Sequence, residues 1–444
     1  MKYGWLLSRK NLIFWIIYEI IIYFTLLSLI IKDYSFNFYS SYFFFLNTWI
    51  LLSYVFGRYV IPPRVSDKKY SIKVNLYSSF ITVFSCFIIN WVINFLMKEN
   101  GLIRDYYFLN LFFIVTYLSQ VIINNIFWNN IKKRIKWIYF GSNEILNFLK
   151  EEKKLLNEKI YFEDINEINF EIIKIKSESD LAGIIIDNED FIDKSQQSEI
   201  FKIQRYGIKV LTPLQWCEKY LQNIPSKLIQ NDDFTKNRFS YIRLGTTQLR
   251  IKRAGDFLFS IFLLLITSPI LILSSIIIYL QDFGPIIYKQ KRTGLNGKNF
   301  FVYKLRSMKI NSEKEGPQWS SKNDCRVTPI GKLIRITRVD ELPQLICVLK
   351  GEMSLIGPRP ERPEFDKAFF NEIPLYELRY FIKPGLSGWA QVNYPYGASE
   401  KDAIKKLSYD LYYISHFSIF LDFLIVFKTI KTILNGKSSI PKSV

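Results

Sequence analysis

Four apolar runs near the N-terminus constrain this chain more than any other feature, because each is long enough to cross a lipid bilayer. A helix of about 20 apolar residues spans the hydrocarbon layer. No cleavable signal pattern precedes the first run, so we expect it to be retained as a span. The sequence therefore predicts four transmembrane helices within residues 1–135. The runs are Leu12–Ile31, Tyr42–Ile61, Val74–Leu96 and Tyr106–Trp128.

Positive charge is unevenly distributed among the loops that join these runs. Lysine and arginine gather before the first run, around the second connection and after the fourth run, whereas the first and third loops carry little positive excess. The positive-inside rule then places the N-terminus and everything after Lys136 in the cytoplasm. A net charge of +19 with 49% hydrophobic residues fits a multi-pass membrane protein with a cationic cytoplasmic side. A basic chain can also bind nucleic acid, but no such motif is present, so we expect no nucleic-acid partner.

The chain has one histidine and no closely spaced cysteine pair, which limits the catalytic and metal-binding chemistry available to it. His416 is the only histidine, and the four cysteines form no C-x-x-C pair, which argues against a zinc site and a disulfide framework. His416 lies in an aromatic, apolar stretch, where a packed or interfacial histidine is expected rather than a catalytic one. Catalytic work therefore falls to Asp, Glu, Lys or Tyr.

Residues 136–245 alternate strand-like and helix-like segments, which predicts a small parallel α/β domain. A dinucleotide site would need G-x-G-x-x-G at the first turn, and only Gly141 is present. We therefore favour a nucleotide-free packing or regulatory domain. The expected strands are Lys136–Gly141, Leu181–Asp187 and Ile208–Leu211, and the expected helices are Asn143–Glu152 and Pro213–Leu221.

A fifth apolar run, Phe257–Leu280, has Ser268 and Pro269 at its centre. Proline removes a backbone donor and bends a helix, so this run can either cross the membrane or dip in and return. In a returning helix, the Ser268 hydroxyl can satisfy a backbone group that the proline leaves without a partner. Basic residues on both sides fit anchoring at an anionic inner surface. The residues alone leave crossing and re-entry both open.

An adjacent acidic pair, Asp340 and Glu341, lies between Arg338 and a Pro-rich segment that contains Arg359. Such a pair suits phosphate chemistry at a metal, since one carboxylate can attack phosphorus while the other holds a divalent cation. Nearby arginines can carry the phosphate charge. The alternative is that the pair belongs to a solvated surface, as most acidic residues do.

Roughly the last 190 residues, from Lys252 onward, resemble the bacterial sugar transferase family. The resemblance rests on several motifs that occur in order in one chain, which is far more specific than any one of them. The motifs are Lys252-Arg253-Ala254-Gly255-Asp256, the Ser268-Pro269 helix, Gly284-Pro285-Ile286-Ile287-Tyr288-Lys289-Gln290, Phe301-Val302-Tyr303-Lys304-Leu305-Arg306-Ser307-Met308, Asp340-Glu341-Leu342-Pro343-Gln344, Gly351-Glu352-Met353-Ser354-Leu355-Ile356-Gly357-Pro358-Arg359-Pro360 and Lys383-Pro384-Gly385-Leu386-Ser387-Gly388-Trp389-Ala390-Gln391-Val392-Asn393.

The resemblance implies the long form of a polyprenyl-phosphate sugar-1-phosphate transferase. Its expected parts are four transmembrane helices in 1–135, a degenerate Rossmann-like cytoplasmic domain in 136–245 and an α/β catalytic domain in 246–444. The helix 257–280 would be re-entrant, which keeps the catalytic domain on the cytoplasmic face of the bacterial inner membrane. For residues 1–250, oligomerisation, including a homo-oligomer, or regulation is the expected role.

The resemblance also implies a mechanism in which Asp340 is the nucleophile. It would attack the sugar-linked phosphate of a UDP-sugar, release UMP and carry the sugar-phosphate to polyprenyl (undecaprenyl) phosphate in the lipid bilayer. This is the first membrane step of exopolysaccharide, O-antigen, capsule or glycoprotein glycan assembly. Mg²⁺ is the expected cofactor, with Glu341 as its candidate ligand.

Five cations are candidates for holding phosphate. A helix over Gly331–Arg338 would place Arg335 and Arg338 on one face, although snorkelling on a membrane-lying helix is the alternative. Lys304 and Arg306 alternate in a predicted strand and would share a face. Arg359 would be presented by a rigid Pro-rich turn, for which a purely structural loop is the alternative.

The helical stretch Ala403–Leu434 has apolar runs interrupted by charges, so we expect interfacial helices that lie in the membrane interface rather than cross it. Two other functions remain as alternatives. A non-enzymatic membrane scaffold accounts for residues 1–250 but leaves the last third of the chain without a role. A transporter would place charged residues inside its spans, and the first four runs carry few.

Overall fold

The chain folds as two compact units that divide between Leu221 and Gln222 in the computed structural model. The structure describes residues 10–30, 36–55, 79, 81–86, 111–119, 122, 135–155, 160–165, 167–171, 173, 181–187, 193–229, 247–310, 312, 324–394 and 399–434. The division comes earlier than the predicted boundary at 245. The segment after Leu221 packs on α15 (Trp389–Asn393) and α16 (Glu400–Ser415) of the second unit. There Ile224 N donates to Ser408 O (2.8 Å) and Trp389 Nε1 donates to Gln222 O (2.9 Å).

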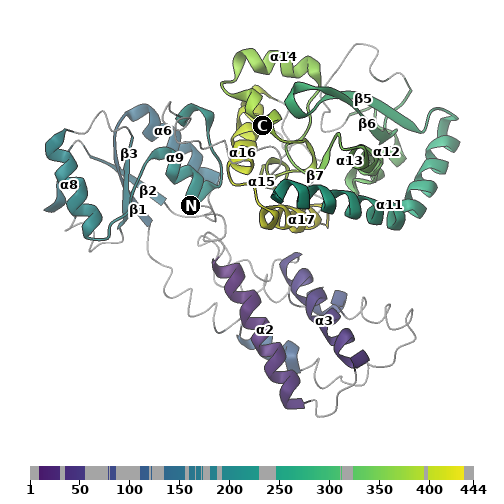
Figure 1. The fold of residues 1–444 in the computed structure, drawn as a ribbon, viewed down its shortest axis with the longest axis horizontal. Coiled ribbons are helices and arrows are strands. Elements are labelled where there is room, and N and C mark those ends of the chain that lie inside the picture. The colour runs from purple at the N-terminus through teal and green to yellow at the C-terminus, as the bar shows by residue number, and fades with distance from the viewer. Residues whose placement is uncertain are drawn as a thin grey trace. The chain divides into compact units, whose positions relative to one another are not determined.

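Two apolar helices, α2 (Lys10–Ile30) and α3 (Phe36–Val55), overlap the first two predicted spans (Figure 1). The third and fourth predicted spans lie largely outside the described residues. Trp49 Nε1 donates to the buried Glu19 carboxylate (3.0 Å) and joins the two helices. One buried cluster takes members from all four predicted spans, as packed helices require, whereas four membrane crossings stay a prediction. The cluster consists of Tyr23, Leu27, Phe45, Leu46, Trp49, Leu52, Cys86 and Phe112.

A four-stranded parallel sheet of order β2-β1-β3-β4 occupies the predicted α/β region. The predicted strands and helices of this region are present. Two elements were not predicted, β2 and α8, because their sequences are short and rich in polar residues. The elements are β1 (Ile135–Phe140), α6 (Asn143–Glu152), β2 (Ile160–Asp164), β3 (Leu181–Ile186), α8 (Lys194–Arg205), β4 (Val210–Leu211) and α9 (Pro213–Trp216).

The turn after β1, where a dinucleotide phosphate would bind in a Rossmann fold, is filled by a carboxylate of the chain itself. Asp187, which follows β3, accepts hydrogen bonds from Ser142 N (3.1 Å), Ser142 Oγ (2.8 Å) and Tyr139 OH (3.1 Å). A Cβ added to Gly141 would lie 2.2 Å from Asp187 Cβ, so glycine is required for this approach. This arrangement agrees with a domain that binds no nucleotide at this turn.

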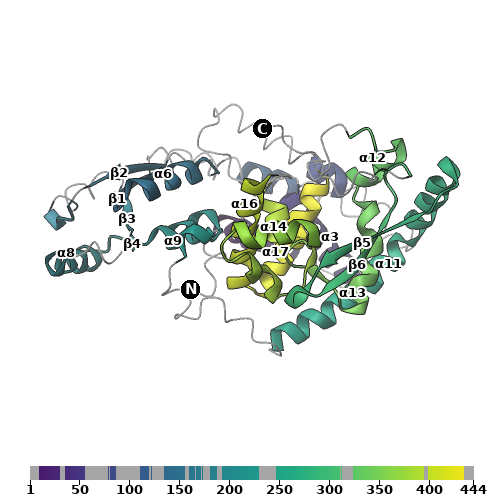
Figure 2. The ribbon, with the colours of Figure 1, turned by 90° about the horizontal axis from the view of Figure 1, so that it is seen from above.

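The second unit contains the elements that carry the sequence motifs. It pairs β5 with β6 in an antiparallel hairpin and β7 with β8 in parallel. Both views show the hairpin beside α13 (Figures 1 and 2). The elements are α11 (Thr247–Asp282), β5 (Ile287–Thr293), β6 (Asn299–Leu305), α12 (Pro329–Ile336), a 3-10 helix (Val339–Gln344), α13 (Leu345–Lys350), β7 (Ser354–Ile356), α14 (Pro363–Glu372), a 3-10 helix (Tyr376–Phe381), β8 (Gly385–Ser387), α15 (Trp389–Asn393), α16 (Glu400–Ser415) and α17 (Ile419–Leu434).

Among the described residues, α11 is the one helix long and apolar enough to cross a membrane. It continues through Pro269 as one unbroken helix, and its ribbon changes direction along its length (Figure 1). Pro269 has no N–H for the carbonyl of Leu265, four residues earlier. The Ser268 hydroxyl donates to that carbonyl instead (2.8 Å), as predicted.

Both ends of α11 contact other elements of the second unit. Near its start, Arg253 donates to Val348 O (2.5 Å) and Leu349 O (2.8 Å) at the end of α13. Near its end, Asp282 pairs with Arg306, and Ile278 packs with Leu305 and Ile334. Between these anchors the apolar side chains are exposed, including Leu258, Phe262, Leu265, Ile266, Ile272 and Leu273.

The predicted interfacial stretch Ala403–Leu434 forms two helices, α16 and α17. The centre of α16 is buried inside the protein: Asp410, Leu411 and Tyr412 are each at most 1% exposed. Only α17 presents an apolar face outward, through Phe420, Phe423 and Val426. The interfacial prediction is therefore corrected for α16, because its aromatic residues fill the core of the second unit.

Candidate active site

The acidic pair lies on a tight turn between two helices. The helix α12 ends at Ile336, and Arg338 adopts a left-handed conformation with φ of 60°. The 3-10 helix Val339–Gln344 follows and contains Pro343, which has no N–H for an α-helical bond. Arg338 therefore leaves α12 and shares no helical face with Arg335, contrary to the predicted helix over Gly331–Arg338.

Three cations converge on the carboxylate of Glu341. Arg359 Nη2 lies 2.7 Å and Lys304 Nζ 3.3 Å from Oε1, while Arg338 Nη1 lies 3.2 Å from Oε2. We call Lys304, Arg338 and Arg359 the cation cluster. Burial pushes the pKa of Glu341 upward, but the cation cluster outweighs it and holds the pKa well below its usual value. Glu341 is therefore a carboxylate that gathers positive charge at this turn.

Asp340 is equally buried but has a different environment. Its side chain is mostly withdrawn from solvent, and its Oδ1 atom has no hydrogen-bond partner among the described residues. Burial, followed by the charge of Glu341, raises the pKa of Asp340 to about 6, against the attraction of Lys304, Arg338 and Arg335. A buried carboxylate oxygen without a partner calls for an explanation, and a reactive group is one of the standard ones.

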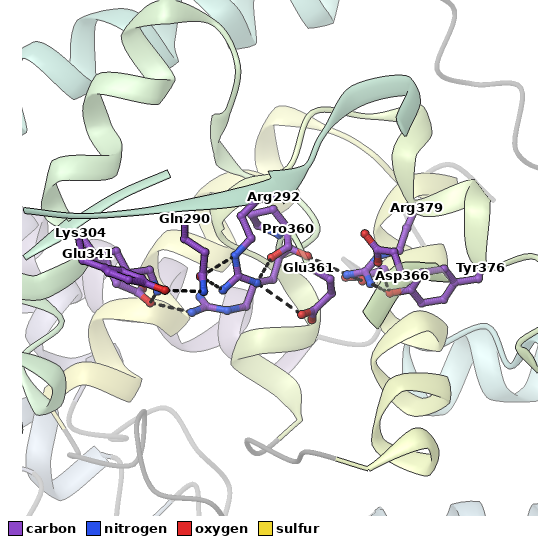
Figure 3. Close-up of polar contacts among 12 residues, drawn as sticks. Gln290, Arg292, Lys304, Glu341, Pro360, Glu361, Asp366, Tyr376 and Arg379 are labelled. Carbon is purple, nitrogen blue, oxygen red and sulfur yellow. Dashed lines mark hydrogen bonds and ion pairs between the residues drawn. The ribbon is translucent and has the colours of Figure 1, made fainter. Parts of the chain in front are cut away.

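The inner face of the β5–β6 hairpin supplies more polar groups. The register pairs Tyr288 with Lys304, so Lys304, Gln290 and Arg292 point to the same side of the hairpin. Burial lowers the pKa of Lys304 to about 8, with Glu341 opposing the shift. Figure 3 shows a row of polar contacts that runs from Lys304 and Glu341 past Arg292 to Arg379.

Arg292 was not predicted as part of the site. It bonds Gln290 Oε1 (2.6 Å) and Pro360 O (3.0 Å), and it pairs with Glu361 (3.7 Å). The alternation of Gln290 and Arg292 on one strand was the available sequence signal. Gln344 was also missed: its buried Nε2 has no partner among the described residues, and it lies three residues after Glu341 on the 3-10 helix, where such side chains eclipse.

The residues present fit a magnesium ion only in a limited way. Among the described residues, no three His, Cys, Asp or Glu side chains converge on one point. Mg²⁺, however, is commonly held by one or two carboxylates together with waters and substrate phosphates. The adjacent carboxylates of Asp340 and Glu341, with the unpartnered Asp340 Oδ1, suit that pattern.

Comparison with known proteins shows which protein family the second unit matches. Residues 247–436 match the family model described as bacterial sugar transferase. A Bacillus subtilis protein, a putative undecaprenyl-phosphate N-acetylgalactosaminyl 1-phosphate transferase by name, is 56% identical over 131 residues, which are 30% of this chain and 73% of that protein. The chain belongs to the bacterial sugar transferase family.

Two further members of the family show how far the likeness extends. The UDP-N-acetylgalactosamine-undecaprenyl-phosphate N-acetylgalactosaminephosphotransferase of Aeromonas hydrophila is 48% identical over 208 residues, 47% of this chain and 49% of that protein. The UDP-glucose:undecaprenyl-phosphate glucose-1-phosphate transferase of Escherichia coli is 39% identical over 182 residues, 40% of this chain and 39% of that protein. The matched region therefore covers about half of the Aeromonas protein and less than half of the Escherichia coli protein.

The structure brings most of the predicted site residues of this bacterial sugar transferase together. Asp340, Glu341, Lys304, Arg338 and Arg359 share one cluster. Arg335 is half-buried near enough to influence the pKa of Asp340, and its guanidinium has no partner among the residues that the structure describes.

Arg306 is not brought into this cluster. It follows the last residue of β6, and its guanidinium pairs with Asp282 and donates to Ile278 O (3.3 Å) at the end of α11. The shared face predicted for Lys304 and Arg306 therefore ends where the strand ends.

Proposed function

We propose that this protein transfers a hexose-1-phosphate from a UDP-sugar to a polyprenyl phosphate, giving UMP and a polyprenyl-diphosphate sugar. One observation carries the proposal: a buried carboxylate, Asp340, has an oxygen with no hydrogen-bond partner in the described part of the chain, and it lies beside a cluster of three cations. Family membership supports it, since the relatives above are named as undecaprenyl-phosphate sugar phosphotransferases.

The reaction divides into two displacements at one phosphorus atom. In the first, an Asp340 oxygen forms a bond to the sugar-linked phosphorus, and the bond to the UMP oxygen breaks. In the second, an oxygen of polyprenyl phosphate attacks the same phosphorus and restores the Asp340 carboxylate. Covalent catalysis of this kind replaces one difficult transfer with two easier ones.

The cation cluster supplies what the first displacement requires electrostatically. A carboxylate that approaches a diphosphate meets negative charge, and preorganised cations in a partly desolvated site stabilise the charge that builds up. Glu341 holds Lys304, Arg338 and Arg359 in place before substrate arrives. Arg335, with no partner of its own among the described residues, is free to bind a phosphate oxygen.

Glu341, together with Asp340, is the group that we propose holds Mg²⁺. A bound Mg²⁺ would supply further neutralisation of phosphate charge. Glu341 Oε1 already accepts from both Lys304 and Arg359, whereas Oε2 accepts from Arg338 and keeps a second lone pair for the ion.

We also propose that α11 enters the membrane and returns on the same side. Arg253 near one end contacts α13, and Asp282 at the other end contacts Arg306, so both ends lie against the same folded unit. A helix that crossed the bilayer would place its two ends on opposite sides of the membrane. The exposed apolar middle would lie in lipid, and the catalytic unit would lie on the cytoplasmic face. The apolar helices of the first unit would make the protein multi-pass.

N-acetylgalactosamine is the first sugar to test, because it is named for the Aeromonas and Bacillus relatives, whose identity exceeds that of the Escherichia coli glucose enzyme. The test is UMP release by the full-length protein in nanodiscs with Mg²⁺, undecaprenyl phosphate and a panel of UDP-sugars. We expect one sugar to give UMP and a labelled lipid. Absence of both products with every UDP-sugar would reject the proposal.

A further inference from the structure

The loop that carries Arg359 is fixed by hydrogen bonds to its backbone carbonyls. Four consecutive carbonyls, those of residues 358–361, each accept a hydrogen bond from outside the loop. Two prolines in the same loop restrict its backbone further. The donors are Gly385 N to Pro358 O (2.8 Å), Arg379 Nη2 to Arg359 O (2.8 Å), Arg292 Nη1 to Pro360 O (3.0 Å) and Thr293 N to Glu361 O (3.0 Å).

The bond to the Arg359 carbonyl comes from a buried arginine that the reaction itself does not use. Arg379 lies on the 3-10 helix Tyr376–Phe381 and is 6% exposed. Its Nη2 also reaches Asp410 Oδ2 (3.2 Å) on α16, and its Nη1 donates to Tyr376 OH. Figure 3 shows Arg379, Tyr376 and Asp366 at the far end of the polar row from Glu341.

The geometry of Arg379 matches what only a guanidinium can do. One Nη2 group donates to a carbonyl and to a carboxylate, while the other arm bonds a phenol, and the planar fork fixes these directions together. A lysine in its place would have one nitrogen on a flexible stem. Asp410, 1% exposed, is the carboxylate that forms an ion pair with Arg379 (3.2 Å).

We propose that Arg379, anchored by Asp410, is a positioning residue that sets where the Arg359 guanidinium lies. This inference rests on the proposed function of the site. The chain of contacts runs from Asp410 through Arg379 to the Arg359 carbonyl, and from the Arg359 guanidinium to Glu341 Oε1 (2.7 Å). Release of that carbonyl lets the loop shift, and a misplacement of about 1 Å in a catalytic site can cost on the order of 100-fold in rate.

The test is a double-mutant cycle on UMP release by the full-length protein. Arg379→Lys is measured alone and in the background of Arg359→Ala, with Tyr376→Phe as the matched control. Tyr376→Phe removes a buried hydrogen bond from the same arginine but leaves its contact with the Arg359 carbonyl. Thermal unfolding is recorded for every variant, so that loss of fold and loss of positioning are separated.

We expect Arg379→Lys to lower kcat about 10- to 100-fold when Arg359 is present and to have little further effect when Arg359 is already alanine. Tyr376→Phe should lose thermal stability yet keep near wild-type activity. Equal effects of Arg379→Lys in both backgrounds would overturn the proposal, because the residue would then act on folding alone. A wild-type protein without UMP release would instead reject the proposed function.

Asp410→Asn keeps the test decisive if Arg379→Lys does not fold. The amide is of the same size and retains an oxygen acceptor for Arg379, but it lacks the charge that anchors the guanidinium. We expect a smaller loss of kcat with the same dependence on Arg359. Full activity of a folded Asp410→Asn protein, or a loss that persists undiminished in Arg359→Ala, would contradict the anchoring role.

Discussion

Replacement of Glu341 by glutamine tests whether this residue organises the cation cluster. The substitution keeps the shape of the side chain and removes its charge. In the wild-type protein Glu341 accepts from Arg359 (2.7 Å), Arg338 (3.2 Å) and Lys304 (3.3 Å). After the change, these three cations face one another without the carboxylate charge that joins them. We therefore expect a loss of stability even when no substrate or metal is bound.

The size of the loss follows from the distances and the exposure of the partners. Two unit charges about 3 Å apart attract by roughly 5 kcal/mol at an effective dielectric of about 20. The side chains of Lys304, Arg338 and Arg359 are 19%, 27% and 30% exposed, so solvent screens part of this attraction. Removal of one partner from a buried pair costs about 3–5 kcal/mol, and we expect the lower end, about 3 kcal/mol. That corresponds to a fall in Tm of roughly 6–12 °C.

The assay is thermal unfolding in nanodiscs with EDTA, compared with Glu372→Gln, which alters an exposed glutamate on α14. Unchanged Tm for Glu341→Gln in EDTA would refute the organising role. Repetition with Mg²⁺ tests the metal assignment separately. If Glu341 holds the ion, Mg²⁺ should raise the Tm of the wild type and of Glu372→Gln but not that of Glu341→Gln.

Four further substitutions test other parts of the structure. Asp340→Ala should abolish both UMP release and a phosphosugar adduct seen by intact-protein mass spectrometry, and retention of the adduct would show that another residue is the nucleophile. Gln344→Leu should slow UMP release roughly 100-fold if its unpartnered Nε2 binds a phosphoryl oxygen, while stability stays equal or rises because a buried donor is removed; a folded protein of full activity would exclude that contact. Burial raises the pKa of Asp410 from 3.8 to about 6, so its contribution to stability is complete well below pH 3.8 and is lost as pH rises through 6, by about 2 kcal/mol between pH 4.5 and 7; urea unfolding of Asp410→Asn at these two pH values should lack this fall. Asp187→Ala should destabilise the first unit by about 1–3 kcal/mol because Ser142 and Tyr139 lose their acceptor, and an unchanged unfolding transition would contradict that role.

Local patterns in the sequence were sufficient for several parts of this protein. The strand β3 is a continuous apolar segment, and β1 is apolar apart from Lys136, a pattern that marks buried strands regardless of their neighbours. Pro269 has no N–H to donate to the carbonyl of Leu265, four residues earlier. The neighbouring Ser268 was therefore predictable as the donor that replaces it. The acidic pair, with Arg359 and Lys304, was found because ordered motifs restrict family membership far more than any single residue does.

The groups that surround Glu341 were decided by tertiary structure. Lys304 reaches it from a hairpin and Arg359 from a loop, and neither distance follows from sequence spacing. Arg306 was predicted beside Lys304, yet the strand ends at Leu305 and the next side chain pairs with Asp282 instead. Arg379 gave no sequence signal, because the Arg359 carbonyl and the Asp410 carboxylate that it bonds lie 20 and 31 residues away along the chain.

The sequence by itself determined which residues are apolar enough for lipid, which segments are strands or helices, and which acidic pair belongs to the transferase motif. These properties depend on neighbours within a few positions. Only the tertiary structure decided that Asp340 keeps a buried oxygen with no partner among the described residues, that Glu341 gathers three cations and that α16 lies in the core. Those properties depend on burial and on contacts between distant segments, which are created when the chain folds.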